Sequence, residues 1–266
     1  MIVIGEKINS SSKSIKPLID NLDGAAIQSL AKKQYEAGAS YIDINAGTFG
    51  KEEPEKLEWL VNTIQEVSDV PFSIDSRNPY AIEKALKANK NSKPIINSIT
   101  VADNSIDSIL PLAVKYNTSI IALCMDGTEM PETVDERIVM AEKLLKLLTY
   151  NGISLEDIYL DPMARPVSAA SHYGLIALES IRRLKKEFPG VHVTCGISNM
   201  SFGLPERKLM NQAFLVAAMT AGLDSAILDP LDRKLMAYLY AGEALLGIDD
   251  FCMEYQMKYR EGLLEI

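Results

Sequence analysis

The chain has 266 residues, 47% of them hydrophobic and 24% charged, with a formal net charge of −9. This length suits one parallel α/β barrel, because such barrels reach about 250 residues as a single domain. The acidic balance argues against nucleic-acid binding, which requires a basic face. No run approaches the roughly 18 apolar residues of a membrane span, and charged Glu6 and Lys7 follow the first apolar stretch too early for a signal peptide. We therefore expect a cytoplasmic protein without nucleic-acid or membrane partners.

The cysteines and histidines give no sign of a disulfide framework or a zinc site. Cys124, Cys195 and Cys252 form no CxxC pair, which is typical of a reducing compartment. His172 and His192 are the only histidines, so a His-rich zinc site is not expected. The prediction is that the protein binds no metal of its own.

Along the chain, short apolar runs alternate with amphipathic segments of helical period. This alternation predicts a parallel sheet covered by helices, with about eight strand–helix units. The predicted strands cover residues 2–5, 41–44, 71–74, 95–96, 119–123, 158–160, 192–195 and 225–228. The predicted helices cover 25–37, 55–67, 79–88, 106–115, 135–148, 174–188, 207–221 and 233–246. A further helix is expected after Asp249, packed on the barrel or on a partner.

This count favours a single (β/α)₈ TIM barrel that comprises residues 1–266 as one domain. The alternative is an open, doubly wound sheet. It is disfavoured because Gly5-Glu6-Lys7-Ile8-Asn9, at the end of the first strand, is not the Gly-x-Gly-x-x-Gly of a dinucleotide-binding turn.

Polar residues follow nearly every predicted strand, at the end of the barrel where active sites lie. Taken singly, such residues are most often turn formers or helix caps, and Asp126 and Asp229 are interpreted in that way. The recurrence favours a binding site, as does the position of Asn97 inside an apolar run. The residues of this rim are Glu6, Asn9, Asp43, Asn45, Asp75, Arg77, Asn78, Asn97, Asp161 and the loop Gly196-Ile197-Ser198-Asn199.

The chemistry of this rim suits a planar heterocycle. Carboxylates accept hydrogen bonds, and neutral amides both donate and accept them. The rim lacks the arginine cluster or glycine-rich loop of a phosphate site, and nothing distinguishes Lys7 or Lys93 as a Schiff-base lysine. A pterin, whose amidine-like edge presents both N–H donors and acceptors, fits this set.

The chain resembles the pterin-binding methyltransferases that act with corrinoid proteins, especially the methyltetrahydrofolate:corrinoid/iron–sulfur protein methyltransferases. Methionine synthase and dihydropteroate synthase are more distant. The likeness extends from the first strand to the eighth, and the order and spacing of its motifs carry it. The motifs are Ile4-Gly5-Glu6-Lys7-Ile8-Asn9, Asp43-Ile44-Asn45, Ser73-Ile74-Asp75-Ser76, Ile96-Asn97-Ser98, Tyr159-Leu160-Asp161-Pro162, Gly196-Ile197-Ser198-Asn199 and Gly222-Leu223-Asp224-Ser225-Ala226-Ile227.

The resemblance implies a barrel of the dihydropteroate-synthase type and a role for each rim residue. Asp75, Asn97 and Asp161 would hold the pterin edge, and Asn199 would reach the methylated ring nitrogen, which makes Asn199 and Asp75 the expected catalytic residues. The remaining residues would assist: Gly196 and Ser198 would shape the loop, Arg207 would lie near the ligand or on the surface, and Glu6, Asp43 and Asn45 would support the binding residues.

The implied reaction moves a methyl group between tetrahydrofolate and the cobalt of a corrinoid, in a direction that the sequence leaves open. The chain lacks the Asp-x-His-x-x-Gly box of a corrinoid-binding segment, so the corrinoid would arrive on a partner protein. One departure from the family pattern is Phe202, where a glutamine is expected. It leaves open how this loop meets the folate tail or the corrinoid.

Three alternatives remain. A dihydropteroate synthase would need cations for a diphosphate, for which Arg233 and Lys234 are candidates. A non-catalytic scaffold would bind pterin without transferring methyl, and a sugar- or phosphate-handling barrel is disfavoured by the missing phosphate loop. Relatives of this family are commonly dimers. We expect a homodimer, to which the apolar segment 235–246 would contribute unless it belongs to the core.

Overall fold

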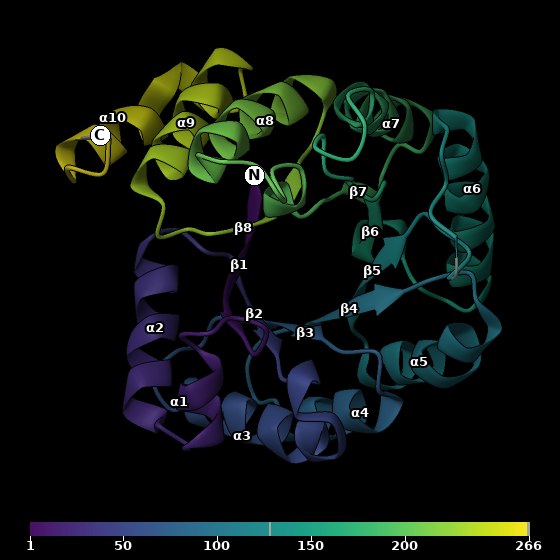
Figure 1. The fold of residues 1–266 in the computed structure, drawn as a ribbon, viewed down its shortest axis with the longest axis vertical. Helices are drawn as coiled ribbons and strands as arrows, with labels where there is room; N and C mark the ends of the chain where they lie inside the picture. Colours follow the sequence, from purple (N-terminus) through teal and green to yellow (C-terminus); the bar gives the residue numbers. More distant parts are fainter. Residues whose placement is uncertain (128, 265–266) are drawn as a thin grey trace.

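Parallel strands form a barrel in the computed structural model, which describes residues 1–127 and 129–264 (Figure 1). The eight strands pair in the order β7-β6-β5-β4-β3-β2-β1-β8, and a parallel bridge between Gly196 and Ile227 joins the two ends. This arrangement confirms the predicted (β/α)₈ fold. The strands are β1 (Ile2–Asn9), β2 (Tyr41–Asn45), β3 (Phe72–Asp75), β4 (Ile95–Ile99), β5 (Ser119–Leu123), β6 (Ile158–Asp161), β7 (His192–Val193) and β8 (Ser225–Leu228).

Helices surround the strands, and several begin at residues that cap them. Asn78 accepts from the backbone N–H of Tyr80 at the start of α4, and Thr133 and Glu136 form a capping box at the start of α6. These local signals explain why the predicted helix starts are close to those observed. The helices are α1 (Lys16–Asp20), α2 (Gly24–Glu36), α3 (Glu53–Gln65), α4 (Pro79–Ala88), α5 (Asp103–Tyr116), α6 (Val134–Tyr150), α7 (Tyr173–Glu187), α8 (Arg207–Ala221), α9 (Arg233–Leu245) and α10 (Met253–Arg260), with 3₁₀ turns η1 (Gly47–Glu52), η2 (Leu155–Asp157), η3 (Ile197–Asn199) and η4 (Asp250–Cys252).

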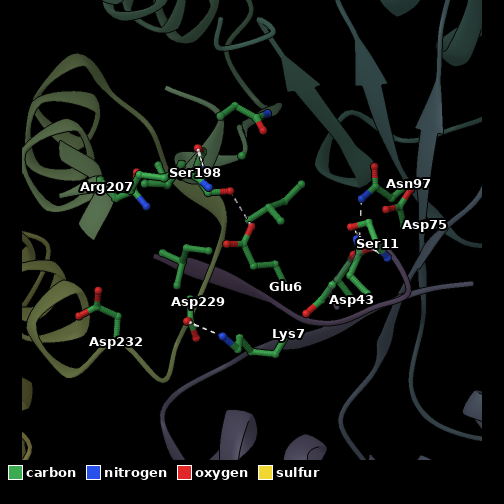
Figure 2. Close-up of a pocket in the computed structure, with 18 of the residues that line it drawn as sticks. Glu6, Lys7, Ser11, Asp43, Asp75, Asn97, Ser198, Arg207, Asp229 and Asp232 are labelled. Atoms are coloured by element: carbon green, nitrogen blue, oxygen red, sulfur yellow. Dashed lines mark hydrogen bonds and ion pairs between the residues drawn. The ribbon is translucent and has the colours of Figure 1, made fainter. Parts of the chain in front are cut away.

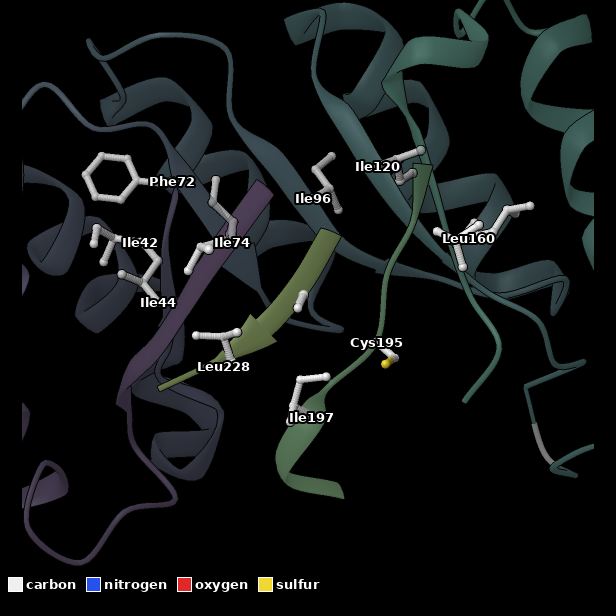
Figure 3. Packing of buried hydrophobic residues seen from close by; sticks show 14 of the residues in the cluster. Ile42, Ile44, Phe72, Ile74, Ile96, Ile120, Leu160, Cys195, Ile197 and Leu228 are labelled. Atoms are coloured by element: carbon white, nitrogen blue, oxygen red, sulfur yellow. The ribbon is translucent and has the colours of Figure 1, made fainter. Parts of the chain in front are cut away.

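The strands alternate their side chains between the outer core and the barrel interior. Ile42, Ile74 and Leu160 belong to the large cluster between the strands and the helices (Figure 3). A smaller, separate cluster includes Ile95 and Tyr159 and fills the interior. Because the period is two, the residue two positions after each interior side chain also faces inward, nearer the carboxyl end. Asn97 and Asp161 therefore face the interior.

The first strand differs from the prediction. It was expected to cover residues 2–5 and instead extends to Asn9. Its pairing with β2 shifts register between Gly5 and Ile8 and continues to Asn9. The polar residues Glu6 and Lys7 interrupt the apolar run, so the sequence pattern ends before the backbone pairing does.

The C-terminal segment forms the expected last helix. Helix α10 packs against α9, with the Lys258 ammonium 5.6 Å from the centre of the Tyr240 ring. On α9, Met236, Leu239 and Tyr240 are buried, so most of the apolar segment 235–246 belongs to the core. Within the described residues, no helix combines the length and apolar character that crossing a membrane would require.

Candidate functional site

A cavity of about 720 Å³ opens at the carboxyl ends of the strands. Figure 2 shows Asp75 and Asn97 on one side, Arg207 and Asp232 on the opposite side, and Glu6 between them. Most of the predicted site residues line this cavity, whereas Asn45, Arg77 and Asn78 of the predicted rim do not: the lining includes Glu6, Asp43, Asp75, Asn97, Asp161, Gly196, Ser198, Asn199 and Arg207. Residues as distant in sequence as Glu6 and Arg207 thus meet because parallel strands place all their carboxyl ends at one rim.

Asp43 and Asn97 are hydrogen-bonded to each other in the wall of the cavity. Asp43 Oδ1 accepts from Ser73 Oγ at 2.6 Å and from Asn97 Nδ2 at 3.1 Å. Burial raises the pKa of Asp43 well above its usual range, and the nearby Asp75 carboxylate adds to the increase. Because the side-chain nitrogen of Asn97 donates to Asp43, the side-chain oxygen Oδ1 of Asn97 is left to accept a hydrogen bond from a ligand.

Asp75 is held by Asn45, which lies outside the cavity. Asn45 Nδ2 donates to Asp75 Oδ2 at 2.9 Å, and Asn45 Oδ1 accepts from Ser10 Oγ at 2.9 Å. Burial raises the pKa of Asp75, while the Asn45 hydrogen bond and the Arg77 charge oppose this increase. The contact fixes one oxygen of Asp75 and leaves the other for a ligand.

Asp161 provides a third aspartate carboxyl group on the wall of the cavity. Its Oδ1 accepts from the backbone N–H of Met163 at 2.7 Å. Burial raises the pKa of this carboxyl to about 7, although the Met163 hydrogen bond and the Arg137 charge lower it. Asp161 therefore changes protonation state near neutral pH, and an N–H donor from a ligand would favour its ionised form.

The loop after β7 carries Asn199 at the mouth of the cavity. Ser198 Oγ donates to Glu6 Oε2 at 3.2 Å, and Arg207 Nη2 donates to the Ser198 carbonyl at 2.7 Å. Arg207 also donates from Nε to Ser201 Oγ at 3.1 Å, so it braces the loop as well as lining the cavity. The Asn199 side chain is exposed and has no hydrogen-bond partner in the described part of the chain. Its amide is thus available to a ligand.

Glu6 faces the same loop from β1. Burial raises its pKa to about 7, and the nearby Asp229 carboxylate adds to the increase. The Ser198 hydrogen bond and the charges of Lys7 and Arg207 act in the opposite direction. A neutral Glu6 is therefore well populated near pH 7, within reach of the loop that carries Asn199.

Two residues of the cavity were interpreted otherwise from the sequence. Asp229 forms the predicted turn by accepting from the backbone N–H of Leu231 at 3.0 Å, and it also binds Lys7 Nζ at 2.8 Å inside the cavity. Lys7 looked like a surface lysine. This pair forms only when β1 and β8 become neighbours, so no local pattern signals it. The described residues contain no group of three His, Cys, Asp or Glu side chains placed to hold a metal ion.

Gly196 lies directly against the Asn199 amide. A Cβ atom at residue 196 would lie 2.9 Å from Asn199 Nδ2, closer than such contacts normally allow. We expect Gly196→Ala to displace this amide and to slow any reaction that depends on it by roughly tenfold, since misplacing a reacting group by about 1 Å costs up to a hundredfold. Turnover and thermal unfolding of the variant would be compared with those of the wild type. Unchanged turnover would show that the position of the amide is unimportant.

Comparison with known proteins also points to a pterin-binding protein. Residues 6–229 match the model of the family described as pterin binding enzyme. A methylcorrinoid:tetrahydrofolate methyltransferase from Eubacterium limosum is 36% identical over 98% of this chain and 97% of its own length. A methionine synthase from Mycobacterium leprae (strain TN) is 28% identical over 85% of this chain, which spans 20% of that longer protein.

Among solved structures, a dihydropteroate synthase from Coxiella burnetii in complex with pteroic acid aligns with a TM-score of 0.67. The alignment covers 91% of this chain and 94% of that one at 16% identity, which supports the shared barrel fold alone. The family match extends from Glu6 on the first strand to Asp229 after the eighth, and so includes every predicted residue of the cavity. The chain belongs to the family of pterin-binding enzymes.

Proposed function

We propose that this protein is a methyltransferase that moves a methyl group between N5 of tetrahydrofolate and the cobalt of a corrinoid carried by a partner protein. The observation that carries the proposal is the Asn199 amide, which has no hydrogen-bond partner among the described residues and lies in a cavity also lined by Asp75, Asn97 and Asp161. The name of the Eubacterium limosum relative, which matches over nearly the whole chain, supports it.

The inner wall of the cavity suits the pterin edge. The free oxygens of Asp75 and Asp161 would accept from the ring N–H and the amino group, and the Asn97 carbonyl would accept a third hydrogen bond. Hydrogen bonds to charged groups contribute about 1.5–3 kcal/mol each. The two bonds to Asp75 and Asp161, together with the bond to the neutral Asn97 amide, give enough binding free energy to orient the pterin before the reaction.

In the transfer toward the corrinoid, cob(I) supplies the electron pair that forms the new cobalt–carbon bond. The bond between N5 and the methyl carbon breaks, its electron pair stays on N5, and N5 takes up one proton. In the opposite direction, N5 attacks the methyl group of methylcob(III), loses its proton and releases cob(I). Because the same bonds and the same proton are involved in both directions, one site serves both reactions.

Asn199 would assist at N5, where charge changes during the transfer. An amide N–H that donates more strongly in the transition state than in the ground state lowers the barrier, by about 3–4 kcal/mol for comparable donors. Asp75 would keep the pterin aligned with Asn199, and Glu6 would support the loop through Ser198. The name of the Eubacterium limosum relative has the methylcorrinoid as donor and tetrahydrofolate as acceptor, and we propose this direction for the reaction in the cell.

The dihydropteroate synthase alternative has less support. Its candidate diphosphate cations, Arg233 and Lys234, do not line the cavity, and Arg233 donates to the carbonyl of Gly262 instead.

The free thiols of Cys124, Cys195 and Cys252 suit a reducing compartment, and we propose that the protein works in the cytoplasm.

The function is tested by giving the purified protein two substrate pairs in parallel under anaerobic conditions. One is 5-methyltetrahydrofolate with cob(I)alamin, followed by the visible spectrum of methylcobalamin. The other is dihydropterin diphosphate with 4-aminobenzoate, followed by chromatography. We expect methylcobalamin from the first pair and no dihydropteroate from the second. Dihydropteroate formation, or tight folate binding without transfer even with corrinoid proteins present, would overturn the proposal.

Folate binding should depend on pH through Asp161. Its pKa of about 7 means that the ionised carboxylate, the form that accepts pterin N–H donors, becomes dominant only above neutrality. We expect the affinity for 5-methyltetrahydrofolate to increase as the pH rises from about 6 to about 8. Asp161→Asn should flatten this dependence. Affinities measured by titration across this range test the prediction, and a wild-type profile as flat as that of the variant would contradict it.

Stability of the free protein should depend on pH in the opposite direction from folate binding, because of Asp161 and Glu6. The folded protein binds the protons of Glu6 and Asp161 more tightly than the unfolded chain does, since both pKa values are raised to about 7. The free energy of unfolding should therefore decrease as the pH rises from the ordinary carboxyl pKa to about 7. Glu6→Gln should reduce this slope in denaturant titrations, and an unchanged slope would exclude Glu6 as its source.

We propose that the protein is a homodimer that associates through α9, η4 and α10. Large apolar side chains are exposed there: Leu245 is 85% exposed, Phe251 is 90% exposed, and Met253 and Tyr259 are each 69% exposed. Patches of this kind on soluble proteins mark interaction sites. Sedimentation should give twice the mass of one chain for the wild type and one chain for Phe251→Glu, with Leu175→Glu on α7 as the exposed control. A monomeric wild type would contradict the proposal.

A further inference from the structure

Asp161 is a buried carboxyl group without a cation at contact distance. It lines the cavity from the end of β6, and its Oδ1 accepts from the backbone N–H of Met163 at 2.7 Å. No described residue forms an ion pair with it. A buried carboxylate is costly unless a positive charge compensates it. To accept a hydrogen bond from a ligand as an anion, Asp161 therefore needs a cation from the protein.

The titratable groups around Asp161 come from the two neighbouring strands and from α6. Cys124 follows β5 and Cys195 follows β7, and both thiols are fully buried. Burial and the Asp161 carboxylate raise the pKa of each thiol, so both thiols stay neutral. The third group is the guanidinium of Arg137, whose positive charge favours the ionised form of Asp161.

Arg137 is a buried guanidinium without a partner. It lies near the start of α6, on the outside of β5 (Figure 1), and only 1% of its surface is exposed. Its Nε and Nη1 atoms are buried, and neither has a hydrogen-bond partner among the described residues. The positive charge persists, because arginine does not lose its proton in proteins. An unpaired buried cation destabilises the fold, so the observation calls for a compensating anion.

The other charges near Arg137 do not supply that anion. Arg165 and Glu132 both act on its charge, and they form an ion pair with each other at 2.6 Å. The Glu132 carboxylate is also 61% exposed, so its attraction for Arg137 is screened by water. Among the described residues, this cluster has two guanidinium groups and one carboxylate. An ionised Asp161 would add the second negative charge.

The fold places Arg137 behind the wall of the cavity. Each helix of the barrel runs antiparallel to its strand, so the start of α6 lies at the end where the strands finish. The ends of β5 and β6 adjoin there, since the backbone N–H of Cys124 donates to the carbonyl of Asp161 at 2.9 Å. Arg137 is not among the residues that line the cavity. Any effect on a ligand must therefore pass through Asp161.

We infer that Arg137 is a positioning residue that keeps Asp161 ionised in the folate complex, by attraction through the buried wall and without touching the folate. The inference rests on the proposed function, because it takes a pterin N–H as the group that Asp161 binds. When that N–H donates to Asp161, the carboxylate stays ionised and its charge balances that of Arg137.

The test measures the affinity for 5-methyltetrahydrofolate from about pH 6 to about pH 9 in the wild type, Arg137→Met and Arg137→Lys. Methionine removes the charge, so the midpoint of the pH dependence should rise by about one pH unit. The affinity of Arg137→Met should be about fivefold weaker at pH 7 and within about twofold of the wild type at pH 9. Arg137→Lys retains the charge and should restore most of the wild-type profile. Arg182→Met, which removes an exposed arginine from α7, is the matched control and should leave the profile unchanged.

A double-mutant cycle shows whether Arg137 acts through Asp161. In Asp161→Asn there is no charge to balance, so adding Arg137→Met should change the folate affinity by less than about twofold. A merely structural arginine would lower the affinity equally in both backgrounds and at every pH. That result, or a wild-type midpoint in Arg137→Met, would overturn the inference and leave the pterin site intact. Absence of folate binding in the wild type would instead contradict the proposed function.

Discussion

Replacing Asn199 by alanine is expected to slow methyl transfer by about a hundredfold or more, with a much smaller effect on folate binding. The reason is that its amide would donate to N5 mainly in the transition state, while the pterin is held by the opposite wall of the cavity. The side chain is exposed and makes no hydrogen bond to another described residue, so its removal should not affect folding. Single-turnover rates and binding constants for the variant separate the two effects.

Asn62→Ala, which removes an exposed asparagine from α3, is the matched control and should retain wild-type rates. An Asn199→Ala enzyme that transfers methyl at the wild-type rate would show that no amide assistance at N5 is needed. If the variant instead loses affinity and rate equally, Asn199 contributes to binding and not specifically to the transition state.

Replacing Asp75 by alanine is expected to weaken binding of 5-methyltetrahydrofolate by about a hundredfold. The variant loses a charge-assisted hydrogen bond to the pterin, worth about 1.5–3 kcal/mol, and leaves the pterin donor without a partner. It also frees Asn45, which donates to Asp75 in the unliganded protein at 2.9 Å. Titration with the folate measures the loss directly.

Stability distinguishes this effect from unfolding. Burial raises the pKa of Asp75, which means that the folded protein pays a cost for ionising it. Asp75→Ala should therefore melt no more than a few degrees below the wild type despite its weak binding. Normal folate affinity in Asp75→Ala would show that this carboxylate does not bind the pterin.

The barrel was predictable because its signal is repeated in every unit. Each strand is a short apolar run, and caps such as Asn78 and Thr133 mark where the next helix begins. The period of two in the strands also places Asp43, Asp75, Asn97 and Asp161 on the interior face, so most of the candidate site followed from the pattern.

Contacts that depend on closure of the barrel were not predictable in this way. The pair of Lys7 and Asp229 joins residues 222 positions apart, and it exists because β1 and β8 lie side by side. Asn211 and Lys208 look like ordinary helix residues in the sequence. Only the packing of α8 beside the cavity shows that they line it.

The extent of β1 was missed for a related reason. Apolar periodicity ends at Gly5, and the strand continues through a register shift to Asn9. Within this stretch Glu6 accepts a hydrogen bond from Ser198 of the loop after β7, a contact that local propensity does not encode.

The activity proposed for this cavity is the passage of a methyl group between N5 of a reduced folate and cobalt. The most direct test is a single turnover with 5-methyltetrahydrofolate labelled with carbon-13 in the methyl group and cob(I)alamin, with the enzyme in excess. We predict that the label appears on cobalt as methylcobalamin, together with one equivalent of tetrahydrofolate. Label that stays on the folate, with free cob(I)alamin and also with corrinoid proteins as acceptors, would show that the protein does not catalyse this transfer.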